Sequence, residues 1–455
     1  MPMTKAIAET PTEAYIAVNP DEALPSGDAR YVALDAVRGT RNIAESLHAL
    51  IMARESGAGA GTSRDYARFL VTGHSGCGKT TELYRLQDLL VQAGFGVVYF
   101  DAGIEFDLQN QNVGWWSILL EMLWQVDEQL SRPPYNLHIP DDLRDRAVEW
   151  LARVVTKKTE RTEMEAALTT ELEASAGLPF FAKVKAALKA FVKTGSSTLK
   201  EIQQEAERRP TVLHDAVSDL ITHVQEGLRE RGRRSLVIIA DGLEKIPLRS
   251  LGERLTTHNA MFIHSGQHLK APPCHLVYAL PLALLSSDNI GQVFPEQPML
   301  MPMVRVLHRD GKEDRRALRK MEEVVACRIA RTVCAPGVIK MLALASGGHI
   351  RDFLRLIHEA ASGVGERITK ADARRAVIGM VDLYNRTIQE QLIAPLDHVV
   401  QYGELPGGPH DGELVNRLLV LEYRNTETWT ALHPCVNDAP RYVRAPRAHQ
   451  EETGV

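Results

Sequence analysis

The chain has 455 residues, of which 44% are hydrophobic and 24% charged, and its formal net charge at pH 7 is -5. This composition is typical of a soluble globular protein with two or three domains, and it excludes a disordered chain. The acidic balance argues against binding of a polyanion by bulk charge, although a local basic face remains open.

The cysteines and apolar runs place further limits on the chain. Five cysteines, at positions 77, 274, 327, 334 and 435, are scattered and lack CxxC spacing, so the sequence indicates neither a disulfide framework nor a zinc site. The first residues have no apolar core of a signal peptide, and no apolar run approaches the roughly 18 residues of a membrane span. We therefore expect a protein of the reducing cytoplasm, without a membrane span.

Hydrophobic patterning predicts an α/β fold of the P-loop NTPase kind, a three-layer parallel sheet. The expected buried strands are 69–72, 96–101, 235–241, 275–282 and 303–307, and they alternate with helical segments. The predicted domains are a flexible N-terminal arm at 1–28, a P-loop ATPase domain at 29–310 with a helical insertion at about 105–210, a helical lid at 311–368, a winged-helix-like domain at 369–445 and a tail at 446–455. In the winged-helix-like part, a helix runs into two strands joined by an Asn-Thr-Glu turn.

The segment 73–80, "GHSGCGKT", fits the phosphate-binding pattern GxxxxGK[ST] without mismatch. Its glycines let backbone N–H groups close around phosphate oxygens, and an apolar strand precedes it while a helix follows. The expected nucleotide ligands are Gly73, His74, Ser75, Gly76, Cys77, Gly78, Lys79, Thr80 and Thr81. Lys79 is expected to reach the outer phosphates, and the Thr80 hydroxyl is expected to bind Mg²⁺.

Two acids follow the third predicted strand. Asp241, at the end of "LVIIAD", is the candidate second magnesium ligand, and its alternative role is a helix cap. Glu244 is the nearest acid that could position the attacking water; its alternative is a solvated residue at a helix start. These residues predict a hydrolytic site for ATP with Mg²⁺.

Three further residues are candidates outside the loop. Arg351 begins a helix after Gly347-Gly348 and could reach a γ-phosphate, or could pair with Asp352 or another acid. Arg328 is a weaker candidate for the same role and fits a surface residue better. His433 ends the second predicted wing strand, and on pattern alone it is more often a structural histidine.

The order of these motifs resembles the bacterial STAND and AAA+ P-loop ATPases, those with NACHT-like or origin-recognition-like modules, over about residues 30 to 440. The resemblance places Arg351 as the sensor arginine of the lid and His433 as a contact of the ADP β-phosphate. The segment 241–245, "DGLEK", matches the family's acidic motif with Glu244 in its second acidic place and a lysine in its third. The polar sensor usual after the fourth strand is missing, since the chain has Ala279, Leu280 and Pro281 there.

These departures favour a slow switch over a fast motor. The expected function is a slowly hydrolysing ATPase that acts as a nucleotide-controlled, oligomerising switch in bacterial signalling or antiphage defence, with a separate effector or sensor protein as partner. A DNA-dependent AAA+ ATPase is the alternative, supported by five C-terminal arginines at 417, 424, 441, 444 and 447. A membrane-proximal regulator is a third hypothesis, based on the lysine-bearing amphipathic pattern at 181–193, which also fits a helix packed on its own domain.

Overall fold

The computed structural model describes residues 7–57, 66–105, 114–144, 146, 206–252, 255–287, 290–363 and 365–445. The lysine-bearing pattern at 181–193, Arg447 and the tail at 446–455 lie outside these ranges. Within them, no helix combines the length and apolar character needed to cross a membrane.

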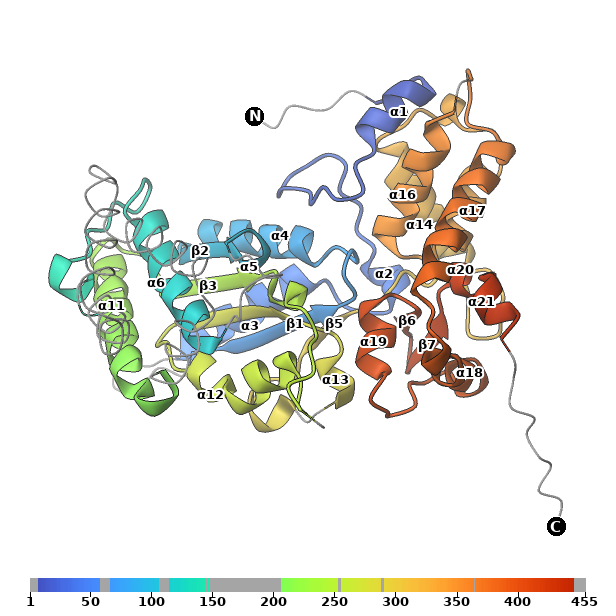
Figure 1. Ribbon diagram of the computed structural model, residues 1–455. Helices are drawn as coiled ribbons and strands as arrows, with labels where there is room; N and C mark the ends of the chain where they lie inside the picture. The colour runs from blue at the N-terminus through green and yellow to red at the C-terminus, as the bar shows by residue number, and fades with distance from the viewer. Residues whose placement is uncertain are drawn as a thin grey trace, which may run out of the picture.

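A five-stranded parallel sheet forms the centre of the first half of the molecule (Figure 1). Its strands are β1 (Arg68–Gly73), β2 (Gly96–Asp101), β3 (Leu236–Asp241), β4 (His275–Leu280) and β5 (Met299–Met301). They lie in the order β2-β3-β4-β1-β5, and β3 and β4 are buried along their whole length. Strands covered on both faces read as apolar runs, and for this reason the sequence located them. The predicted α/β class is confirmed.

The fifth strand differs from the prediction. Residues 303–307 were expected to form it, but β5 comprises Met299–Met301, which pairs with Val71–Gly73 of β1. Pro302 follows directly and has no N–H to continue the ladder. The Met303 N–H is instead donated to the Glu422 carbonyl at 2.9 Å, in the C-terminal half of the chain.

Helices cover the two faces of the sheet and complete three layers. On one face, α3 (Ile43–Gly57) and α4 (Lys79–Gln92) share a core with Val71, Val237 and Val277. On the other, α6 (Trp115–Leu130), α11 (Pro210–Glu230) and α12 (Gly266–Leu269) share a core with Leu70, Ile238 and Leu276. Alternate residues of each strand therefore enter opposite cores. Short elements between these are α5 (Ala102–Glu105), η1 (Leu243–Lys245), the π-helix η2 (Asn259–His264), α13 (Leu284–Ser287) and η3 (Ile290–Gln292).

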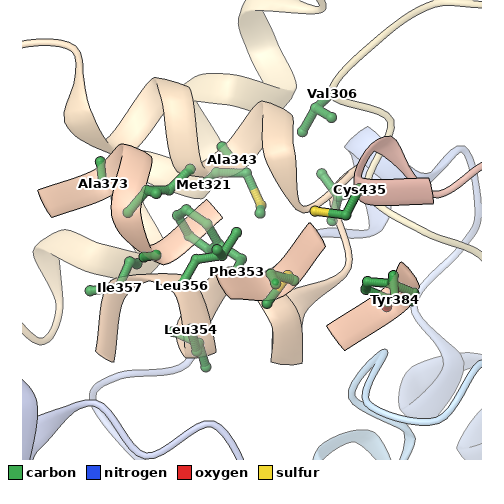
Figure 2. Close-up of a cluster of buried hydrophobic side chains, with 14 of the residues drawn as sticks. Val306, Met321, Ala343, Phe353, Leu354, Leu356, Ile357, Ala373, Tyr384 and Cys435 are labelled. Carbon is green, nitrogen blue, oxygen red and sulfur yellow. The ribbon is translucent and has the colours of Figure 1, made fainter. Parts of the chain in front are cut away.

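The second half of the molecule is mainly helical and has a third core. Its elements are α14 (Arg315–Ala326), η4 (Arg331–Val333), α15 (Val338–Ala345), α16 (Ile350–Ala361), α17 (Lys370–Thr387), η5 (Glu390–Leu392), α18 (Ile393–Tyr402), α19 (Asp411–Asn416), β6 (Val420–Arg424), β7 (Thr428–Leu432), α20 (Pro434–Asn437) and α21 (Pro440–Val443). Phe353 is fully buried at the centre of this core, with Met321, Leu356 and Ala343 around it (Figure 2). Strands β6 and β7 form the antiparallel hairpin that the sequence predicts.

Residues 7–28 belong to the segment expected to be a mobile arm, and they make specific contacts with the rest of the molecule. Helix α1 (Pro11–Ala17) is capped by Thr10, whose hydroxyl accepts from the Glu13 N–H, and Ala14 is fully buried. The helix packs on α16, and the Tyr15 ring stacks on His358 with centroids 3.9 Å apart. Ala8 exchanges backbone hydrogen bonds with Arg328 and Ala330. The chain then leads through residues 18–34 to α2 (Asp35–Arg38), beside the end of the sheet (Figure 1).

Candidate nucleotide-binding site

The phosphate loop joins β1 to α4 in a conformation that depends on its glycines. Gly73, Gly76 and Gly78 have φ angles of 153°, 83° and 107°, in the region that L-residues with side chains rarely adopt. A Cβ on Gly76 would lie 2.7 Å from the Arg351 Cβ, and one on Gly73 would lie 2.6 Å from the Met301 carbonyl oxygen. The loop is therefore shaped by its own glycines and by close packing against β5 and the start of α16.

A cavity of about 390 Å³ opens beside this loop. The sheet domain contributes Ser75 to Thr81, Asp101 and Glu244 to its lining, and the helical half contributes Ile350, Arg351 and Leu354. Residues of the N-terminal segment, including Asp21, Leu24 and Tyr31, form another wall, where the Leu24 N–H donates to the Thr81 hydroxyl at 3.1 Å. The cavity lies at the end of α4, whose N-terminal N–H groups favour an anion.

Lys79 and Glu244 form a buried ion pair in this cavity. The Lys79 ammonium donates to the carbonyls of Gly73 and His74 at 2.9 and 3.1 Å and lies 3.4 Å from Glu244 Oε1. Burial raises the pKa of Glu244, while the Lys79 charge opposes that rise. The second oxygen, Oε2, is buried without a hydrogen-bond partner among the described residues. Glu244 therefore has a free acceptor next to the phosphate loop, which suits a water or a phosphate-bound metal.

Asp241, the expected magnesium ligand, is fully buried at the end of β3. Its carboxylate accepts from the Tyr99 hydroxyl and from the Gly242 N–H, each at 2.8 Å. It does not line the cavity, whereas Asp101, its register partner on β2, does. Thr80 and Asp101 line the cavity, and a hydroxyl and a carboxylate are oxygen donors of the kind that Mg²⁺ takes. Asp101 also pairs with the Lys245 ammonium at 2.7 Å. Thr80 with Asp101 would hold the ion at the cavity, where it would neutralise charge on a bound phosphate.

Arg351 is one of the residues of the helical half that contact the phosphate loop. Its Nη1 donates to the Ser75 hydroxyl at 2.9 Å, and its Nε lies 3.2 Å from Asp21 of the N-terminal segment. The acid beside it is therefore Asp21, whereas Asp352 lies against His349, His433 and Tyr384. Arg328, the weaker candidate for the same role, is not a surface residue: it is buried, lines the cavity, and donates to the carbonyls of Arg30 and Val324 at 3.2 and 2.7 Å.

Three expected ligands lie away from the cavity. The Gly73 backbone and the His74 ring are not part of its lining; His74 Nε2 accepts from the Glu422 N–H of β6 at 3.0 Å. Burial, together with the charges of His349 and Lys79, lowers the pKa of His74 to about 3, so its ring is neutral at pH 7. His433 is also buried outside the cavity. Its Nδ1 accepts from the Cys435 N–H at 3.2 Å, and its Nε2 lies 3.3 Å from Asp352 Oδ2.

Sequence reasoning missed two residues that contact carbonyls of the phosphate loop, Arg38, which also lines the cavity, and His349, which does not. Arg38 ends α2, is 6% exposed, and donates to the Cys77 carbonyl at 2.6 Å. His349 precedes α16, and its Nε2 lies 2.7 Å from the Ser75 carbonyl. Each stands next to a glycine turn, Arg38 before Gly39 and His349 after Gly347-Gly348, and this position is the only signal that the sequence offers for them.

The sheet order, the phosphate loop between β1 and α4, and the cavity beside it define a P-loop NTPase fold.

Comparison with known protein families and with curated proteins finds no match. Among solved structures, the chain is similar to the Orc1 protein of Aeropyrum pernix in complex with DNA, with 13% identity, a TM-score of 0.37 and coverage of 89% of this chain and 94% of that one. It is also similar to the Orc2 protein of Aeropyrum pernix in ADPNP-ADP complexes, with 15% identity, a TM-score of 0.41 and coverage of 94% and 97%. For Cdc6p of Pyrobaculum aerophilum the identity is 13%, the TM-score 0.36 and the coverage 90% and 98%. Because these identities and TM-scores are low, the fold class is assigned from the chain's own sheet order and phosphate loop.

Proposed function

We propose that the chain is an ATP-binding, slowly hydrolysing ATPase of the AAA+/STAND type that acts as a nucleotide-controlled switch. One observation carries the proposal: the cavity at the phosphate loop is walled by both halves of the molecule, and Arg351 of α16 reaches Ser75 of the loop at 2.9 Å. A nucleotide in this cavity would have its phosphates between the sheet domain and the helical half. A γ-phosphate would therefore change the contacts between them.

The energy required for such a switch is within reach of these residues. Moving a population from about 1:99 to 99:1 requires roughly 5.5 kcal/mol of differential binding. Charge-assisted hydrogen bonds from Lys79, Arg351 and Mg²⁺ to a γ-phosphate would contribute about 1.5 to 3 kcal/mol each. Two or three such bonds are sufficient.

Slow hydrolysis follows from the same site. Glu244, the candidate base, is tied to Lys79 at 3.4 Å, and Asp241 is occupied by Tyr99 and Gly242. The chain has Pro281 directly after β4, where a polar group would help to position water. ATP hydrolysis then requires the Lys79–Glu244 pair to rearrange so that Glu244 can act as the base. Slow hydrolysis of this kind suits a switch that holds its nucleotide.

The proposed context is a cytoplasmic homo-oligomer that forms in the ATP state and acts on a separate effector or sensor protein in bacterial signalling or antiphage defence. Gel filtration with a slowly hydrolysed ATP analogue and Mg²⁺ tests the assembly. We expect the wild type to elute as a larger species with the analogue than with ADP. Lys79→Ala is expected to show neither this change nor a nucleotide-induced thermal shift. Lys312→Ala, on an exposed loop, is the matched control and is expected to behave as the wild type. A wild type that stays a monomer, as Lys79→Ala does, would contradict the assembly.

A DNA-dependent ATPase is the second candidate, favoured by the exposed arginines of the C-terminal part. Arg417, Arg424, Arg441 and Arg444 are exposed around the β6–β7 hairpin and α21, the part expected to be a winged helix. Phosphate contacts by these side chains would make DNA binding fall steeply with salt concentration. This candidate is supported if the wild type binds a DNA duplex at low salt and the double variant Arg424→Ala/Arg444→Ala does not. If the wild type does not bind the duplex at low salt, the candidate is rejected.

A further inference from the structure

Three successive carbonyl groups of the phosphate loop are held by donors from outside the loop. The Ser75 carbonyl lies 2.7 Å from His349 Nε2, the Gly76 carbonyl accepts from the Arg351 backbone N–H at 3.3 Å, and the Cys77 carbonyl accepts from Arg38 Nη2 at 2.6 Å. A carbonyl oxygen can only accept, so His349 carries a hydrogen on Nε2. Two of these donors precede or begin α16, and the third ends α2.

These contacts determine where the N–H groups of the loop point. In a trans peptide, the N–H of one residue points opposite to the carbonyl of the residue before it. The peptide bonds of the loop are trans, since the only cis bond of the described chain joins Pro133 and Pro134. His349 lies outside the cavity, so holding the Ser75 carbonyl toward it aims the Gly76 N–H the opposite way. The contact with Arg38, which itself lines the cavity, likewise fixes the direction of the Gly78 N–H. An inward ring of N–H groups is what binds phosphate in such loops.

His349 is itself oriented by a buried carboxylate. Its Nδ1 lies 3.1 Å from Asp352 Oδ2, and the same oxygen accepts from the Tyr384 hydroxyl at 2.6 Å. A carboxylate oxygen can only accept, so it attracts Nδ1 when that nitrogen carries a hydrogen in addition to the one on Nε2, as in the imidazolium form. His433 Nε2 lies 3.3 Å from it, and because His433 Nδ1 accepts from the Cys435 N–H, Nε2 carries the hydrogen that faces the carboxylate. His349 and His433 are fully buried, and Asp352 is 2% exposed. Burial alone would raise the pKa of Asp352, but the two histidines hold it below its usual range.

We propose that His349 is a positioning residue that holds the phosphate loop in its anion-binding form from outside, and that Asp352 and His433 set its orientation. Arg38 fixes the Cys77 peptide, two residues further along the loop, from a position in the cavity wall. The inference rests on the proposed function, in which this loop binds nucleotide phosphates. His349 does not line the cavity, so its effect on nucleotide affinity passes through the Ser75 peptide. The chain His433–Asp352–His349–Ser75 connects the C-terminal part to the loop.

The test compares two amide replacements of His349. In Gln, the terminal nitrogen takes the place of imidazole Nε2 and can still donate to the Ser75 carbonyl. In Asn, the amide takes the place of Nδ1, so it can face Asp352 but is too short for the loop. With a fluorescent ADP analogue and Mg²⁺, we expect the dissociation constant to rise about 10-fold in His349→Asn, the effect of roughly one or two hydrogen bonds, and less than about 3-fold in His349→Gln. His398→Ala, which removes the contact from this α18 histidine to the Glu404 carbonyl, is the control and is expected to leave binding unchanged.

A second measurement separates positioning from a loss of stability. Without nucleotide, amide hydrogen exchange at Gly76 and Gly78 is expected to quicken in His349→Asn more than exchange in the strands of the sheet. His433→Ala is expected to weaken binding several-fold in the wild type and to add nothing in His349→Asn. Equal binding by the Asn and Gln variants, at the wild-type level or below it, would overturn the positioning role. If Lys79→Ala abolishes binding while His349→Asn does not weaken it, the nucleotide site stands and this inference falls; if Lys79→Ala binds normally, the proposed function itself fails.

Discussion

At the scale of single residues, the structure places some of the expected site residues around one cavity and others outside it. Lys79, Glu244 and Arg351 line one cavity, and their side chains were identifiable from a motif, a strand end and a glycine turn. Asp241 and His433 lie outside it because each has buried partners from distant segments, Tyr99 for Asp241 and Asp352 for His433. A single sequence does not pair residues that are far apart in the chain. For the same reason, neither Arg38 nor His349 could be assigned to the loop.

Glu244 is expected to control the rate of hydrolysis. Glu244→Gln keeps the shape of the side chain but removes its basicity, so ATP turnover should fall by roughly 100-fold to 10,000-fold. Binding of a fluorescent ADP analogue should persist, because the phosphate loop is unchanged. Phosphate release measured under single-turnover conditions checks this, with Glu313→Gln on the surface as the matched control. Unchanged turnover would assign the base to another acid of the cavity, such as Asp101.

His74 is expected to make stability depend on pH. Its folded pKa of about 3 lies below its ordinary value of 6.5, so the unfolded chain binds a proton first as pH falls. The residue has no effect above pH 6.5, and below it the free energy of unfolding decreases until about pH 3, by at most about 1.4 kcal/mol per pH unit. His74→Gln should show a shallower loss of stability than the wild type between pH 6.5 and 4.5. Denaturant unfolding at several pH values would check this, and parallel curves would contradict it.

At the scale of elements, the sequence located what its local patterns determine. The buried strands β1 to β4 and the β6–β7 hairpin follow from apolar runs and turn residues. Strand β5 was displaced because Pro302 ends pairing at a point that an apolar pattern does not mark. Helix α1 was missed because its seven residues have only two buried positions, Pro11 and Ala14, and gain their stability from α16. Short helices depend on packing more than on propensity.

Docking of α1 is expected to matter for nucleotide binding, because the segment that follows it walls the cavity. Ala14→Asp places an unpaired carboxylate between α1 and α16 and should release the helix. We expect a several-fold weaker affinity for the fluorescent ADP analogue and faster proteolysis within residues 18–34. Thr12→Asp puts the same charge on the exposed face of the same helix and serves as the control. Equal affinities of the two variants would show that α1 does not support the cavity.

At the scale of the whole molecule, the buried side chains form three cores. Two lie on the faces of the sheet, and the third fills the helical half, where Figure 2 shows part of it. Leu421 and Tyr423 of β6 enter a core of the sheet, so the C-terminal hairpin packs on the first half of the molecule. The sequence predicted the order of the parts along the chain. Their packing depends on contacts between residues hundreds of positions apart, for which local periodicity gives no signal.

The rate at which buried cysteines react with a thiol reagent can show whether nucleotide stabilises the sheet domain and the helical half together. Cys274 lies in a core of the sheet and Cys435 in the helical half, and burial raises the pKa of each thiol to about 12. Labelling by a thiol reagent therefore requires opening. Nucleotide at about 1000 times its dissociation constant adds roughly 4 kcal/mol to the free energy of unfolding. In a chain with Cys327→Ser and Cys334→Ser, Cys77 remains as a third thiol. Labelling is therefore followed at Cys274 and Cys435 separately by peptide mass spectrometry, and we expect it to slow at both. Protection of Cys274 alone would place the nucleotide on the sheet domain only, and Lys79→Ala should show no protection.

The glycine turn at 347–348 has a consequence for the evolution of related chains. Both residues have positive φ angles, 59° and 80°, and a Cβ on Gly348 would collide with the Val304 carbonyl, while the Tyr423 hydroxyl donates to the Gly347 carbonyl at 2.6 Å. No larger residue fits here without moving three segments at once. In an alignment of homologues, we therefore expect the two glycines to be invariant and His349, Asp352 and His433 to be exchanged as a set, so that their covariation would identify chains that share this junction.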